Sequence, residues 1–234
     1  LPLSEEARLQ SLRGAFAESL ETAKRAAELV EADSEVPIYT KALVWAGLGQ
    51  QLVRAEQYGE AKPYLIKALD IMRSDATPSK ADMIPSLSSL AKICIWEGDL
   101  EGARRYAEQA DQFVDAAGSL GLQDIWQSKR ILAEIALEQN RTSDAIALMQ
   151  IAVDRQASRL AALSKISTYA SEFETENVRS DVEMYFKAVL SSHAMPQKDF
   201  IERMFKVAQL PSASYTIQAI NGISGRFSTN DAAL

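Results

Sequence analysis

Residues 45–68 read WAGLGQQLVRAEQYGEAKPYLIKA, and their pattern of small and apolar residues returns twice further along the chain. Residues 87–110 read LSSLAKICIWEGDLEGARRYAEQA, residues 129–152 read KRILAEIALEQNRTSDAIALMQIA, and each stretch begins 42 residues after the one before it. A fixed period of about 20 to 50 residues is the signature of a repeat architecture. The chain is therefore predicted to stack similar units.

The three aligned stretches share columns of small and apolar residues. Neighbouring columns lie three or four residues apart, which places them on one face of an α-helix. Glycine or alanine at such a position lets a second helix approach closely, so we expect each unit to be a pair of packed helices. The columns are Leu48, Leu90 and Leu132; Gly49, Ala91 and Ala133; Leu52, Cys94 and Ala136; Val53, Ile95 and Leu137; Ala61, Ala103 and Ala145; and Ala68, Ala110 and Ala152.

Glycine, proline and polar clusters divide the chain into helices. Turns within units are expected at residues 56–59, 97–99 and 139–142, where Asp99 and Thr142 can cap the helix that follows. No stretch alternates with the period of two that a strand requires, so the predicted class is all-α. Helices are expected at residues 3–13, 18–29, 37–56, 58–73, 79–97, 99–117, 122–139, 142 onward, 160–173, 182–190, 200–210 and 215–227, with loops at 172–177 and 195–196.

The period also predicts the domain organisation. Residues 1–156 hold the repeats, as a partial first unit (1–36) followed by units at 37–78, 79–120 and 121–156. The period is then lost, because Glu174 stands where Leu132 stood and Lys187 where Ala145 stood. Residues 157–234 are expected to form a helical capping or linker segment that leads towards a C-terminal domain outside this chain.

Composition and charge restrict the class of partner. The 234 residues include 47% hydrophobic and 24% charged ones, as in proteins that bury a core. Acidic residues outnumber basic ones by 32 to 25, for a net charge of -7, whereas a surface that binds nucleic acid is usually basic. No apolar run approaches the roughly 20 residues of a membrane span. We therefore expect a protein or peptide partner, and no nucleic acid, membrane or small-molecule substrate.

The chain begins at Leu1 instead of a methionine. We expect that an upstream segment was removed, either at a cloning boundary or by processing of a signal segment. The expected location is the cytoplasm, with export behind a removed signal peptide as the alternative.

The unit that contains Trp45, Leu48, Gly49, Ala61 and Ala68 resembles the tetratricopeptide repeat (TPR). The later units keep the leucine and alanine columns but have Leu87 and Lys129 at the tryptophan position. Their period exceeds the usual 34 or so residues of the family, which is similar to a variety with longer helices. The resemblance implies a helical-repeat solenoid that binds other proteins. A HEAT-like array of similar period is the structural alternative.

The tail carries a second resemblance, on residues 204–210 (MFKVAQL), 212–214 (SAS), Ala219, 226–227 (RF) and 230–234 (NDAAL). This pattern is similar to the segment that joins the repeats of bacterial CHAT proteins to their caspase-like domain. It departs from that pattern at Pro211, Gly222 and Gly225. The resemblance implies that the chain is the regulatory or sensor part of a protease whose His and Cys lie beyond Leu234. A free-standing TPR adapter is the alternative function.

No catalytic constellation is predicted within the chain. Cys94 and His193 are the single cysteine and the single histidine, and Cys94 occupies a packing column, while His193 ends a predicted helix where a cation is favourable. One cysteine also excludes an internal disulfide and a thiolate cluster for zinc. We expect no enzyme activity, cofactor or metal. Solvated helix ends are the interpretation of five acidic residues, Glu5, Glu6, Glu172, Glu174 and Glu176. The glycine-rich stretch at residues 221–226 (NGISGR) is only a weak match to a phosphate-binding loop.

The first helix of each unit lines the concave face in TPR proteins, so its exposed positions are the expected partner-binding residues. Trp96, near lysine and arginine, is the expected anchor for a peptide or helix; the alternative is that Trp96 packs against the next unit. The lysine and asparagine pattern that binds a peptide carboxylate is absent, since the chain has Ala46 and Gln50 there. The expected groove residues are Gln50, Arg54, Lys92, Trp96, Arg130 and Glu134.

Overall fold

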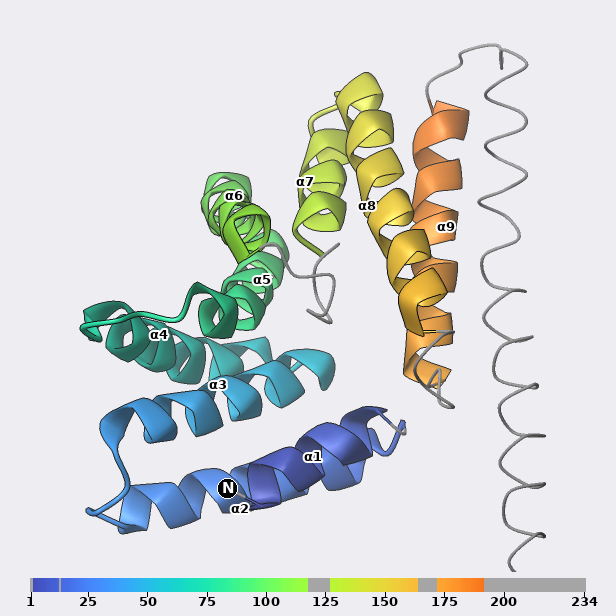
Figure 1. The fold of residues 1–234 in the computed structure, drawn as a ribbon. Coiled ribbons are helices and arrows are strands. Elements are labelled where there is room, and N and C mark those ends of the chain that lie inside the picture. The colour runs from blue at the N-terminus through green and yellow to red at the C-terminus, as the bar shows by residue number, and fades with distance from the viewer. Residues whose placement is uncertain (1, 13, 118–126, 164–171, 192–234) are drawn as a thin grey trace, which may run out of the picture. The chain divides into compact units, whose positions relative to one another are not determined.

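The computed structural model describes residues 2–12, 14–117, 127–163 and 172–191 (Figure 1). Within these residues every regular element is an α-helix and there is no strand, as expected for the all-α class. The helices are α1 (Pro2–Leu12), α2 (Phe16–Ala32), α3 (Ile38–Arg54), α4 (Tyr58–Ser74), α5 (Lys80–Trp96), α6 (Leu100–Ala117), α7 (Gln127–Glu138), α8 (Thr142–Leu163) and α9 (Glu172–Ser191).

The chain divides into two compact units, Leu1–Ile135 and Ala136–Leu234. In the first unit the helices pack as the pairs α1–α2, α3–α4 and α5–α6 (Figure 1). The first helices of successive pairs also touch, because α3 contacts both α1 and α5. This arrangement of helix pairs with contacts between their first members is that of a TPR-like helical repeat.

One turn conformation recurs every 42 residues. Gly14, Glu56, Gly98 and Asn140 all have positive φ, at 79°, 59°, 78° and 56°. At each turn this residue donates its N–H three residues back and the next residue donates five residues back, as in Gly98 to Ile95 (3.0 Å) and Asp99 to Cys94 (2.8 Å). This is the Schellman motif, which satisfies the last carbonyls of the first helix. The turn at Gly14 shows that the α1–α2 pair keeps the same register as the later pairs.

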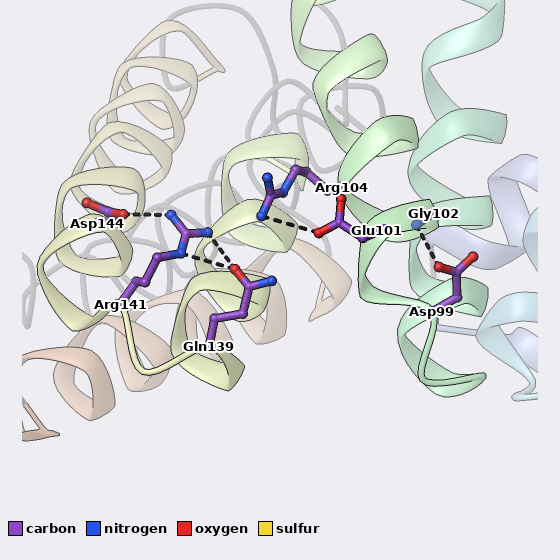
Figure 2. Close-up of polar contacts among 7 residues, drawn as sticks. All are labelled: Asp99, Glu101, Gly102, Arg104, Gln139, Arg141 and Asp144. Carbon is purple, nitrogen blue, oxygen red and sulfur yellow. Dashed lines mark hydrogen bonds and ion pairs between the residues drawn. The ribbon is translucent and has the colours of Figure 1, made fainter.

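The predicted cap at Asp99 is confirmed, because its Oδ1 accepts a hydrogen bond from the Gly102 backbone N–H at 2.8 Å (Figure 2). The expected cap at Thr142 is wrong, since Thr142 is the first residue of α8 and not the residue before it. At that turn Arg141 instead bonds Gln139 and Asp144 through its long side chain (Figure 2).

Close packing of each pair depends on the small columns. Ala61, Ala68, Ala103 and Ala110 are fully buried. At Gly49 a Cβ atom would lie 2.6 Å from Cγ of Leu65, so α3 and α4 touch at a point where no side chain fits. The small columns expected from the sequence are therefore buried in the α3–α4 and α5–α6 pairs, and Gly49 is a point of contact between its two helices.

Polar contacts between successive pairs repeat the same spacing. Arg54 in α3 donates to Ser11 Oγ in α1, and Tyr39 in α3 donates to Asp82 Oδ2 in α5 at 2.8 Å. Both pairs of residues are 43 positions apart. Such contacts hold the first helices of neighbouring units in one register.

The tryptophan position explains how the units differ. Trp45 is buried in α3, and Lys67 Nζ lies 3.4 Å from the centre of its ring. Lys129 takes the equivalent position in α7, where its Nζ donates to Asp111 Oδ2 at 2.6 Å. The repeat that begins with α7 therefore has a largely buried ion pair between α6 and α7 in place of the aromatic contact.

In the second compact unit (Ala136–Leu234), α8 and α9 pack together. Tyr185 is buried there, and its hydroxyl donates to Gln150 Oε1 at 3.0 Å. The predicted loop at residues 172–177 is wrong, because α9 begins at Glu172. Three glutamates there suit a helix, since glutamate is a good helix former and favours the positive end of the helix dipole. Leu160 and Leu163 of the predicted helix 160–173 belong to α8, and Phe173 belongs to α9.

Several expectations fall outside the described residues. They are the start of the helix at 122–139, the loop at 195–196, the helices at 200–210 and 215–227, His193, and the glycine-rich residues 221–226. The domain boundary at residue 156 remains a prediction.

We predict opposite effects for two alanine substitutions in α3. Gly49→Ala should lower the free energy of unfolding by about 1 to 3 kcal/mol, because its methyl group overpacks against Leu65. Gly47→Ala should raise it by about 0.5 to 1 kcal/mol, since a Cβ at Gly47 meets nothing within 4 Å and alanine favours the helix. Urea unfolding followed by circular dichroism measures both. Equal effects of the two substitutions would contradict the close contact at Gly49.

Candidate partner-binding surface

The six expected groove residues lie on the first helices of three successive units. Gln50 and Arg54 are in α3, Lys92 and Trp96 in α5, and Arg130 and Glu134 in α7. All are half-buried except Trp96, which is 64% exposed. Among the six, Trp96 therefore offers the largest apolar side chain to a partner.

Trp96 is held by a ring contact with Tyr58. The two ring centroids are 5.2 Å apart and the planes are tilted by 39°. Tyr58 is the first residue of α4 and Trp96 the last of α5, so the pair bridges two successive units. The alternative interpretation was that Trp96 packs against the next repeat. A side chain that is mostly exposed does not fit that interpretation.

Charged groups surround this aromatic pair. Lys62, one turn after Tyr58, donates to both carboxylate oxygens of Glu97 at 2.7 and 2.6 Å, and this hydrogen bond raises the pKa of Lys62. Burial raises the pKa of Tyr58, and the negative charges of Glu56 and Glu134 raise it further. The charged groups near the aromatic pair are therefore of both signs.

The basic groove residues have contacts within the chain. Arg54 donates to Ser11 in α1, so its guanidinium links α3 to α1. Lys92 and Arg130 are half-buried and also take part in interactions within the chain. The structure therefore gives Arg54 a structural contact that the groove expectation did not include.

The repeat pattern did not predict Tyr58, Lys62 and Glu97 as part of this surface. Tyr58 begins the second helix of one unit, and it meets the end of the next unit's first helix only because the two units stack. The available signal was position: in a TPR-like array the start of a second helix lies near the end of the following first helix.

Cys94 is a packing residue, as its column predicted. It is buried with Ala91, Ala103, Ile131 and Ile135 in one cluster that also includes Ala107. Burial raises the pKa of the thiol, which is the opposite of what a nucleophile requires.

The structure also describes some of the other sites that the sequence singled out. Glu5 accepts hydrogen bonds from the Arg8 guanidinium, which lowers the pKa of Glu5. In the described ranges no three His, Cys, Asp or Glu side chains gather as they would around a metal ion. None of the helices described is both long enough and apolar enough to cross a membrane.

Solved structures similar to this chain are TPR-like repeat proteins. A crystal structure from Podosopora anserina, assigned as a kinesin light chain with nearly identical TPR-like repeats, is 17% identical; the match covers 93% of this chain and 94% of that one, with a TM-score of 0.50. A single-substitution variant of the same protein gives the same identity and TM-score over 94% and 95%. The sequence matches no protein-family profile and no curated protein. The likeness establishes a TPR-like helical-repeat fold.

We predict that Cys94 is unreactive in the folded chain. Because its thiol is buried and its pKa is raised, little thiolate exists at neutral pH, so iodoacetamide should label it much more slowly than in the unfolded chain. Intact-mass measurement over time, with and without denaturant, gives both rates, and Cys94→Ser is the control without a thiol. Labelling of the native chain as fast as the unfolded one would contradict the buried position.

Proposed function

We propose that this chain is a non-catalytic scaffold that binds a protein partner through the first helices of its repeats, with Trp96 as the anchor. The exposure of Trp96 carries the proposal. Tyr58 holds the indole in place through ring contact, so the partner does not have to order the side chain on binding. Tryptophan is also enriched among the residues that contribute most to binding energy at protein interfaces.

The surrounding groove residues would set specificity. Gln50 lies on α3 and Glu134 on α7, the first helices before and after α5, and charged and polar groups at an interface mainly steer association and reject wrong partners. The TPR-like fold supports this role, because stacked helix pairs present an extended surface on which several units can contact one partner.

A more specific proposal concerns the larger protein. Residues 204–234 resemble the segment that precedes the caspase-like domain of CHAT proteins, and on this basis we propose that the chain is the regulatory part of such a protease in the bacterial cytoplasm. These residues lie outside the described part of the chain, so the support is the sequence alone. The free-standing TPR adapter is the competing proposal.

Reading the coding sequence past Leu234 separates these two proposals. We expect a further domain that carries one histidine and one cysteine in a caspase-like arrangement. A stop codon directly after Leu234 would leave the adapter as the better description.

Trp96→Ala should weaken partner binding by tenfold or more, in line with the roughly 2 kcal/mol lost at an interface anchor. A partner retained by the immobilised wild-type chain would be purified, and its affinity measured by calorimetry. Leu29→Ala is the matched control, because Leu29 is a 54% exposed apolar residue on α2, a second helix. Unchanged affinity for Trp96→Ala, with the fold intact by circular dichroism, would exclude Trp96 as the anchor.

A further inference from the structure

The contact between α6 and α7 differs in chemistry from the equivalent contacts earlier in the chain. We call such a contact, between a second helix and the first helix of the next repeat, a joint. Two columns of the 42-residue repeat lie at the joints, one on the second helices and one on the first helices that follow. The former holds Ala27, Leu69 and Asp111, and the latter holds Trp45, Leu87 and Lys129. The residues of the two earlier joints are apolar and buried, whereas the residues at the α6–α7 joint carry opposite charges.

Asp111 is the centre of a polar network at the α6–α7 joint. Its Oδ2 accepts a hydrogen bond from Lys129 Nζ at 2.6 Å, and its Oδ1 accepts one from Ser128 Oγ at 3.0 Å. Ser128 is fully buried, and the side chains of Lys129 and Asp111 are only 17% and 13% exposed. The network is therefore largely removed from water, at positions where the preceding joint has Leu69 and Leu87.

Charged groups at a joint lower the free energy that is needed to open it. Both charges lose hydration when the joint closes, and their attraction offsets that cost only in part, so that well-packed apolar residues at the same place often stabilise a protein more. When the joint opens, both charges regain water, whereas two separated leucines would expose apolar surface. We therefore expect α6 and α7 to separate more easily than α4 and α5.

The apolar part of the joint contains the single cysteine. Ile131 and Ile135 of α7 lie in one buried cluster with Cys94 of α5 and with Ala103 and Ala107 of α6. Separation of α7 from the α5–α6 pair opens this cluster to solvent, so the thiol reports on the joint. The division between the two compact units also falls within α7, after Ile135.

We propose that the α6–α7 joint is a conformational switch, which opens by release of the network of Asp111, Ser128 and Lys129 while the α3–α4 and α5–α6 pairs stay folded. The inference does not depend on the proposed function. If a partner binds as proposed, opening separates the groove residues of α7 from Trp96 on α5, and the surface is continuous only while the joint is closed.

Hydrogen exchange at several low urea concentrations, followed by mass spectrometry, tests the inference on the full chain. Local opening exposes little surface and depends weakly on urea, whereas exchange through global unfolding depends on it steeply. We expect the amides of α7 to exchange through local opening, about tenfold or more faster than those of α5. Labelling of Cys94 by iodoacetamide should show the same weak dependence on urea, from the other side of the joint.

A triple variant tests whether the polar network causes the opening. Asp111→Leu, Ser128→Val, Lys129→Leu gives the joint the apolar residues found at equivalent positions of earlier repeats, which are Leu69, Val44 and Leu87. Exchange of α7 and labelling of Cys94 should both slow by about tenfold or more, because no charge gains hydration on opening.

Two single variants complete the test. Lys129→Met leaves the Asp111 carboxylate at the joint without its cation, so both rates should rise by about tenfold. This variant decides the question if the triple variant does not fold. Glu101→Gln is the matched control, since it removes an exposed ion pair with Arg104 on the same helix α6 and should change neither rate (Figure 2).

Two results would overturn the inference. The first is that α7 exchange and Cys94 labelling both rise steeply with urea from the lowest concentrations, because both would then require global unfolding. The second is that the folded triple variant, or Lys129→Met in its place, keeps the rates of the wild-type chain. Neither result bears on Trp96 as a partner-binding anchor.

Discussion

The close approach of paired helices at small residues is the constraint on which the rest of the structure depends. Where α3 crosses α4, Gly49 leaves no room for even a methyl group against Leu65, and the buried alanines Ala91 and Ala133 take the matching positions in α5 and α7. A pair that packs this closely can bury its apolar faces with short side chains. Because a small residue recurs at this position every 42 residues, successive helix pairs can pack in the same way.

The recurring Schellman turn fixes where each second helix begins, and therefore which residues lie at the surface near the turns. It ends α1, α3 and α5 with the same two hydrogen bonds, so each second helix starts from an equivalent place. Tyr58 at the start of α4 can then meet Trp96 at the end of α5. An aromatic pair on the surface is thus a consequence of stacking.

Much of the fold could be predicted because burial in a helix pair follows a local period. The columns of Leu48, Gly49 and Ala61, and the turns near Glu56, Gly98 and Asn140, needed no knowledge of tertiary structure. The prediction of a loop at 172–177 failed because a run of mostly polar residues suits both a loop and the start of a helix. For the candidate surface, the sequence identified Trp96 but neither Tyr58 nor the Lys62–Glu97 pair.

By itself the sequence determined the helix class, the repeat period and the positions where helices touch within a unit. These properties depend on the spacing and size of side chains along the chain, which the sequence gives directly. Only the tertiary structure decided which side chains meet across units, such as Arg54 with Ser11, Trp96 with Tyr58 and Lys129 with Asp111. The physical reason is that a helical pattern specifies which face is buried, whereas the crossing of two units decides which side chain each exposed group reaches.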